Sequence, residues 1–89
     1  MLKCFNWNTE KNKLLMKERR VSFEMCLVKI ENKAIIDILL NKNYPNQKIF
    51  VIEIDDYVHL VPFVETEQEI FLKTIIPSRK FTKKYLKNE

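Results

Sequence analysis

The chain of 89 residues contains no glycine. At average usage, a chain of this length would hold about six glycines. Glycine-rich loops that cradle phosphate groups, such as the P-loop and the dinucleotide-binding fingerprint, are therefore excluded. Other residues must also take the backbone positions that need a positive φ angle, and we expect asparagine and aspartate at those positions.

Several other features are scarce, and each scarcity excludes a class of protein. No apolar run approaches the roughly 18 residues of a spanning helix, and residues 1–8 lack the apolar region of a secretory signal. We therefore expect a cytoplasmic protein that does not use a membrane. The two cysteines, Cys4 and Cys26, lie in apolar contexts, which favours reduced thiols in or near the core. Together with the single histidine, His59, they have no metal-site spacing, so we expect neither a metal nor a cofactor.

Charge is abundant but unevenly distributed along the chain. The net charge is +4, from 16 Lys and Arg against 12 Asp and Glu. Residues 1–33 hold eight cations and four acids (+4), residues 34–69 two and seven (−5), and residues 70–89 six and one (+5). The two ends are basic and the middle is acidic, and a basic surface of this kind suits a polyanion such as RNA.

The densest basic pattern follows Ser78, which is a good helix N-cap. A step of about 100° per residue would place five cations within an arc of about 140°. These are Arg79, Lys80, Lys83, Lys84 and Lys87. Phe81 and Tyr85 would lie on the opposite side of the helix and dock against the protein. The alternative is that the lysines are simply solvated and suit the negative end of the helix dipole.

Periodicity also predicts two helices near the N-terminus. Asn8 or Thr9 caps the first, which should run to about Arg20. Ser22 caps the second, and Asn32 should end it in a left-handed conformation. The apolar residues of this second helix recur at helical spacing.

Four later segments have the composition of strands in an antiparallel meander: residues 34–40, 48–54, 57–65 and 69–76. A tight turn at Asp55-Asp56 should pair Ile54 with Tyr57, Ile52 with His59 and Phe50 with Val61. Pro62 predicts an edge or a bulge. Both faces of this hairpin are apolar, so helices or a partner should cover both. With a possible fifth strand in residues 1–7, the fold class is α+β, one domain of residues 1–89.

Three segments, in this order, resemble the BrnT-like toxins of bacterial toxin-antitoxin pairs, within the RelE/ParE superfamily of small ribonuclease toxins. Phe5-Asn6-Trp7-Asn8 resembles the family's Phe-Glu-Trp-Asp opening, and Val21-Ser22-Phe23-Glu24 matches its Val-Ser-Phe-Glu segment. Residues 75–84 resemble its Ile-Ile-Ser-Ala-Arg-Lys-Ala-Thr-basic-basic signature, with Tyr85 near the tyrosine that often follows. The family's usual glycine before Val-Ser-Phe is Arg20 here.

The resemblance implies a toxin with a RelE-like fold, acting as an endoribonuclease on mRNA, free or bound to the ribosome. It also implies a cognate antitoxin that silences the toxin, often a ribbon-helix-helix DNA-binding protein. A non-catalytic module that binds nucleic acid or protein through the C-terminal basic helix is the alternative.

Cleavage of RNA by its own 2′-hydroxyl needs a base, positive charge at the phosphorane and an acid for the leaving 5′-oxygen. We assign the charge to Arg79, whose planar fork can hold two phosphate oxygens. Tyr85, Tyr57 or His59 would transfer protons. Backbone contacts to RNA are expected from Lys80, Lys83, Lys84, Lys87 and Lys73. The alternative interpretation is that Tyr85 and His59 are packing residues.

Overall fold

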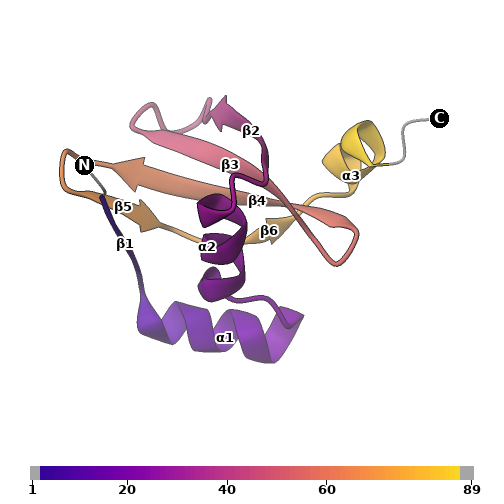
Figure 1. Cartoon of the computed structure of the whole chain (residues 1–89), viewed down its shortest axis with the longest axis horizontal. Helices are drawn as coiled ribbons and strands as arrows, with labels where there is room; N and C mark the ends of the chain where they lie inside the picture. Colours follow the sequence, from indigo (N-terminus) through magenta and orange to yellow (C-terminus); the bar gives the residue numbers. More distant parts are fainter. Residues whose placement is uncertain (1–2, 87–89) are drawn as a thin grey trace.

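The computed structural model describes residues 3–86, which form three helices and one six-stranded sheet (Figure 1). The helices are α1 (Thr9–Arg19), α2 (Phe23–Glu31) and α3 (Arg79–Tyr85). The strands are β1 (Cys4–Trp7), β2 (Ile35–Leu40), β3 (Gln47–Ile54), β4 (Tyr57–Glu65), β5 (Glu69–Leu72) and β6 (Ile76–Pro77). The α+β class is confirmed. None of the helices in this part of the chain is long and apolar enough to cross a membrane.

The strand order is β1-β5-β4-β3-β2, and β6 pairs with β4 beyond the end of β5. The β1–β5 pair is parallel and the other pairs are antiparallel, so the sheet is mixed. The expectation of one continuous strand over residues 69–76 is wrong, because this segment forms two strands, β5 and β6.

Pro62 explains why the segment is interrupted. The carbonyl oxygen of Pro62 accepts the N–H of Lys73 at 2.8 Å, but proline has no N–H with which to continue the ladder. Phe63 pairs with Leu72 and Leu60 with Ile76, so two residues of β4 oppose three residues, 73–75. The connection between β5 and β6 therefore has one residue more than the stretch of β4 beside it. The irregularity expected near Pro62 lies in this neighbouring connection, and the edge position is wrong because β4 lies inside the sheet.

The β3–β4 hairpin has the expected register. Its partners are Ile54 with Tyr57, Ile52 with His59 and Phe50 with Val61. Asp55 and Asp56 have φ angles of 54° and 63°, as a two-residue type I′ turn requires. This turn lets the two strands pair along their whole length.

Two basic residues also take a positive φ angle, which the sequence did not indicate. Arg20 and Lys33 both have φ of 58°. Asn32, expected to be left-handed, has φ of −86°, so that expectation is wrong. The N–H of Ala34 bonds to the carbonyl of Lys29 at 2.8 Å, a Schellman pattern that puts the left-handed residue one position later, at Lys33.

The helices begin at the predicted caps. The side chain of Asn8 accepts the N–H of Lys11, that of Ser22 the N–H of Met25, and that of Ser78 the N–H of Phe81. Each cap satisfies one of the free N–H groups of a first helical turn.

One face of the sheet, which we call the covered face, packs against α1 and α2. Its buried residues form the core together with side chains from these helices: Leu15, Val21, Phe23, Cys26, Phe50, Ile52, Ile54, Val61, Phe63, Leu72 and Ile75. Burial raises the pKa of the Cys26 thiol to about 12. Cys4 is exposed, so its expected place near the core is wrong.

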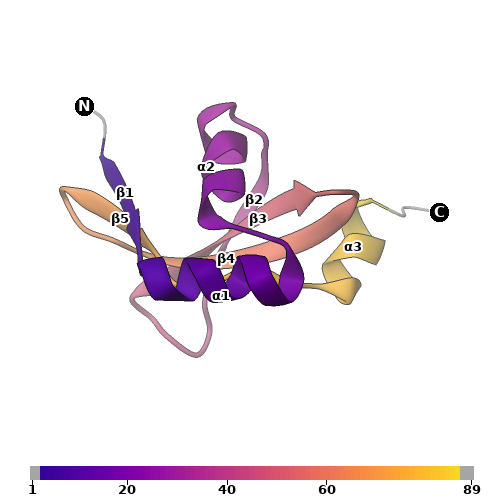
Figure 2. The same cartoon turned by 90° about the horizontal axis from the view of Figure 1, so that it is seen from below.

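The other face, the open face, is only partly covered. Because directly paired residues share a face, it contains Leu39, Ile49, Leu60, Val64, Phe71 and Ile76. Val51 and Val58 on this face are fully buried, but Ile76 is 43% exposed and the other five residues are half-buried. Figure 2 shows α2 on one side of the β3–β4 hairpin and α3 at the end of that hairpin.

Candidate nucleic-acid interface

The cations of α3 are exposed and have no acidic partner within the described chain. We call Arg79, Lys80, Lys83 and Lys84 the α3 cluster; all four side chains are exposed. None of them forms an ion pair with an acid among residues 3–86. Lys87, the fifth predicted member, lies outside the described residues. The acidic β3–β4 turn lies at the same end of the molecule as α3 in both views (Figures 1 and 2).

Thr82 holds α3 on the sheet. Its side chain is 2% exposed, and its hydroxyl oxygen accepts the N–H of Val58 at 2.8 Å. The same hydroxyl donates to the carbonyl of Ser78 at 2.7 Å, and the N–H of Ser78 donates to the carbonyl of Val58 at 2.9 Å. The start of α3 therefore continues the hydrogen bonding of β4. The sequence pattern assigned this docking to Phe81 and Tyr85 and missed Thr82, which follows Ser78 by one helical turn.

Phe81 and Tyr85 lie next to each other and are half-buried, and two lysines lie over their rings. The ring centroids are 5.9 Å apart with an interplanar angle of 17°. The Nζ atoms of Lys80 and Lys84 lie 5.9 and 5.7 Å from the Phe81 centroid, and that of Lys84 lies 5.2 Å from the Tyr85 centroid. An aromatic ring attracts a cation but does not neutralise it. Both lysines thus keep their full charge for a polyanion.

Tyr85 reaches across to β2. Its hydroxyl donates to a carboxylate oxygen of Asp37 at 3.2 Å. Asp37 pairs with Val51, so this bond lies on the open face of the sheet.

His59 lies on the opposite, covered face, since it pairs with Ile52. It is 7% exposed, and its Nδ1 lies 3.0 Å from the carbonyl oxygen of Tyr57. A carbonyl only accepts, so Nδ1 carries the hydrogen and Nε2 keeps a lone pair. Burial lowers the pKa of His59, which favours the neutral ring. The ring of Tyr57 packs edge-on against it, with centroids 5.8 Å apart.

The structure therefore does not gather all four proposed catalytic side chains at one point. Tyr57 and His59 are adjacent on the covered face, whereas the Tyr85 hydroxyl is on the open face with Asp37. Arg79 begins α3 directly after Ser78, and Pro77 pairs with His59. The pair Tyr57 and His59 and the single residue Tyr85 are therefore alternatives for proton transfer. His59 lies beside Pro77, which is in the segment that leads into α3.

Lys73 is separate from the α3 cluster. It is exposed and follows the last residue of β5, and its Nζ lies 5.4 Å from the ring centroid of Phe71. Like Lys80 and Lys84, it has an aromatic ring as its neighbour. The sequence-based prediction missed this contact between Lys73 and Phe71. Its signal was the spacing of two residues, because alternate residues of an extended chain share a face.

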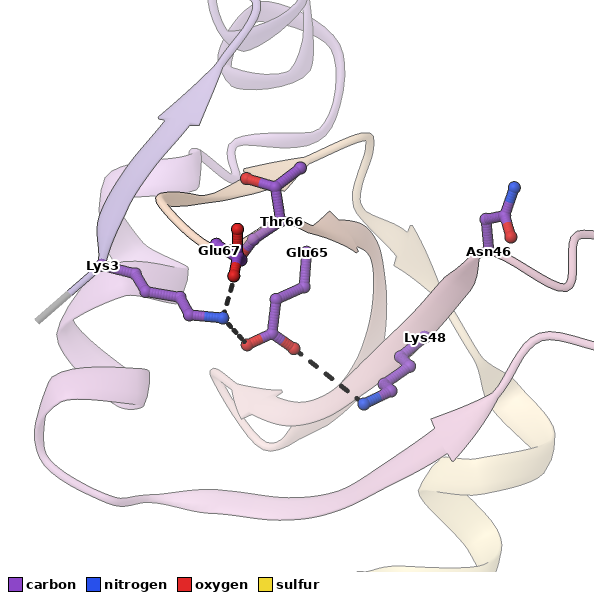
Figure 3. A pocket seen from close by; sticks show the side chains of 6 residues that line it. All are labelled: Lys3, Asn46, Lys48, Glu65, Thr66 and Glu67. Atoms are coloured by element: carbon purple, nitrogen blue, oxygen red, sulfur yellow. Dashed lines mark hydrogen bonds and ion pairs between the residues drawn. The ribbon is translucent and has the colours of Figure 1, made fainter.

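A second group of cations has a carboxylate at its centre, and we call Lys3, Lys48 and Glu65 the Glu65 cluster (Figure 3). The ammonium of Lys3 donates to Glu65 at 2.5 Å and to the carbonyl of Thr66 at 2.8 Å. Lys48 approaches the other oxygen of Glu65 at 3.9 Å. The hydrogen bond from Lys3 lowers the pKa of Glu65, and the charges of Lys3 and Lys48 lower it further. A carboxylate here disfavours a bound phosphate.

Two of the three segments that carry the family resemblance have structural roles. The rings of Trp7 and Phe23 stack with centroids 5.6 Å apart, and Phe5 packs against the same core. The side chain of Asn12 accepts the N–H of Phe23 at 2.7 Å and donates to Glu24 at 2.8 Å. These contacts join β1, α1 and α2, so the third segment, residues 75–84, is the one that builds the candidate site.

Comparisons of the chain with protein-family models, with curated proteins and with solved structures find no match. The fold and the α3 cluster define an α+β domain with a cationic helix at one end of its sheet, and the cations of this helix form no ion pair with an acid among residues 3–86.

Proposed function

We propose that this chain is the toxin of a bacterial toxin-antitoxin pair, with a RelE-like fold, and that it cleaves RNA. The observation that carries the proposal is the α3 cluster: four exposed cations without an acidic partner among residues 3–86. Charged side chains in this state bind phosphate without first breaking an ion pair. The match of residues 75–84 to the family signature supports the choice of RNA as the polyanion.

In the proposed reaction, the RNA 2′-hydroxyl attacks the adjacent phosphate and the 5′-oxygen leaves. Arg79 stabilises the charge that develops on the phosphorane, and the lysines of α3 hold neighbouring phosphates. His59 is one candidate base, because its lowered pKa favours the neutral ring and Nε2 has a lone pair, but its side chain is 7% exposed on the covered face. Tyr57, whose ring touches His59, is the favoured acid, and Tyr85 is the alternative.

The proposed partner is an antitoxin that covers the α3 cluster. The open face next to α3 supports this proposal, since it carries a row of half-buried apolar residues and Ile76, which is 43% exposed. Exposed apolar surface of this kind marks interaction sites.

The test is cleavage of a single-stranded mRNA fragment by the purified protein, alone and on translating ribosomes. We expect new RNA ends from the wild type and a rate at least about 100-fold lower for Arg79→Ala, the scale found when one charge-stabilising donor is removed. Lys42→Ala, an exposed cation in the loop before β3, is the matched control and should cut normally. Absence of new RNA ends under both conditions would contradict the proposal that the protein is a ribonuclease.

The separation of Tyr85 from His59 on opposite faces favours a second candidate, a module that binds nucleic acid without cleaving it. Both candidates predict RNA binding through α3. Only the enzyme predicts new RNA ends that disappear in Arg79→Ala while binding is partly retained.

A further inference from the structure

We propose that the groove between α1 and β5 binds one nucleotide of a single-stranded RNA, with the base against Phe71 and the phosphate between two lysines. The groove has a volume of about 600 Å³ and is lined by Asn8, Glu10, Lys11, Leu14, Phe71 and Lys73. The choice of RNA as ligand rests on the proposed function, but the site is distinct from α3.

The topology creates this groove. Trp7 pairs with Leu72, so the parallel strands β1 and β5 end side by side. The chain then turns at Asn8 into α1, while β5 ends at Leu72 and is followed by Lys73. The first turns of α1 therefore lie beside the end of β5, and their side chains share one depression.

The lining combines an apolar floor with cations. Phe71 is half-buried and Leu14 is 46% exposed, so an aromatic ring and an aliphatic side chain are both accessible. Lys11 and Lys73 form no ion pair with an acid among residues 3–86, and Lys73 Nζ lies 5.4 Å from the Phe71 centroid. A ring for stacking with cations beside it is the usual site for an unpaired base and its phosphate.

Glu10 is the one acid of the lining, and it lies in the first turn of α1. The positive end of the helix dipole stabilises a carboxylate there. A carboxylate accepts hydrogen bonds, so its partner would be a ribose hydroxyl or a base amino group and not a phosphate. An acidic peptide is less favoured, because its carboxylates would be repelled by the carboxylate of Glu10.

The groove and α3 flank the same surface. Phe71 pairs with Val64 and Ile76 pairs with Leu60, which places all four side chains on the open face. Tyr85 of α3 also reaches this face, through Asp37. An RNA strand held by the α3 cluster can therefore continue over apolar side chains to Phe71.

Binding of an eight-nucleotide oligouridylate at 0.1 M salt, followed by fluorescence anisotropy, tests the groove. Phe71→Leu keeps an apolar side chain but removes the ring, and we expect about 5- to 150-fold weaker binding with an unchanged salt dependence. Lys73→Gln should reduce the log-log salt slope by about 0.7. Lys42→Gln, an exposed lysine outside the groove, should change neither quantity.

A second measurement guards against an indirect effect of Phe71→Leu on folding. With a 5-iodouridine in the same RNA, ultraviolet light should cross-link the wild type at the peptide containing Phe71. Three results would each overturn the proposal that the groove binds a nucleotide. They are wild-type affinity and salt slope in both variants, no binding by the wild type, and cross-links confined to α3. RNA bound through Phe71 but never cut would contradict the proposed ribonuclease and leave the groove in place.

Discussion

Two groups of cations in this protein differ in what lies between them. In the Glu65 cluster, Lys3 and Lys48 approach one carboxylate from opposite sides (Figure 3). In the α3 cluster, Lys80 and Lys84 lie over the ring of Phe81, and no acid among residues 3–86 pairs with them. Lysines that look equivalent in the sequence are thus partly neutralised in one place and available in the other.

The fold determines which of these charges is offset by an acid. Glu65 lies near the end of β4, and the β1–β5 and β3–β4 pairings bring a lysine to each side of it. The α3 helix has no acid of its own. Its aromatic side places rings next to the lysines, and each exposed cation–π contact stabilises by only about 0.5–1 kcal/mol. A phosphate can replace such contacts easily.

Neutralising the lysines of each cluster should give the largest contrast. The variant Lys80→Gln/Lys83→Gln/Lys84→Gln should bind single-stranded RNA on the order of 100-fold more weakly at 0.1 M salt, because three phosphate contacts are lost at about fivefold each. The control Lys3→Gln/Lys48→Gln removes two lysines that share the carboxylate of Glu65, which offsets one of their two charges, and should weaken binding by no more than about fivefold. Equal losses per removed lysine in the two variants would show that only net charge matters.

The anchoring of α3 can be tested with two variants that each remove one hydroxyl. Thr82→Val leaves the buried N–H of Val58 without a partner, and we expect the free energy of unfolding to fall by about 1–3 kcal/mol. Tyr85→Phe removes an exposed bond to Asp37 and should cost less than about 1 kcal/mol. Urea denaturation measures both. A Tyr85→Phe loss larger than that of Thr82→Val would mean that Thr82 is not the anchor.

The free energy of unfolding should depend on pH through His59. Burial lowers the pKa of His59 below its ordinary 6.5 in the folded protein. Above pH 6.5 the ring is neutral in both states; as the pH falls, the unfolded chain binds the proton first. The free energy of unfolding should then decrease until the pH passes the native pKa, by at most about 1.4 kcal/mol per pH unit. His59→Gln should remove this part of the pH dependence, and an identical slope in both proteins between pH 6.5 and 5 would contradict it.

The smallest effect is expected when the Glu65 cluster is made to resemble the α3 cluster. Glu65→Gln frees Lys3 and Lys48, and RNA affinity at 0.1 M salt should rise by no more than about fivefold, the value of one added phosphate contact.

The lowered pKa of Glu65 adds stability above pH 4.5 that is lost as the pH falls through the native pKa. Glu65→Gln should therefore flatten the acid side of the stability profile, whereas Glu67→Gln, at an exposed acid without an ion pair among residues 3–86, should not.

Much of the fold follows from local signals in the sequence. Asn8, Ser22 and Ser78 cap the helices because their side chains accept an N–H of the first turn. Asp55-Asp56 fixed the register of the β3–β4 hairpin because only a tight turn pairs Ile54 with Tyr57. These features depend on a few neighbouring residues, so a pattern reveals them.

The features that were missed depend on contacts between distant segments. The bond from Val58 to Thr82 and the parallel β1–β5 pair connect residues far apart in the chain. The split of residues 69–76 arises from Pro62 on the neighbouring strand, and no signal within the segment itself reports it. For the candidate site, the exposed cations of α3 were predictable from helical spacing, whereas the faces occupied by His59 and Tyr85 required the three-dimensional register.

The salt dependence of RNA binding by the wild-type protein is the sharpest test of the proposal that α3 binds RNA. Four phosphate contacts from Arg79, Lys80, Lys83 and Lys84 contribute about −2.8 to the log-log slope for a single strand, at about −0.7 per contact, and the phosphate proposed in the groove brings the slope near −3.5. A slope between zero and about −0.7 would mean that at most one of these cations meets a phosphate, and the account of α3 as an RNA-binding helix would be contradicted.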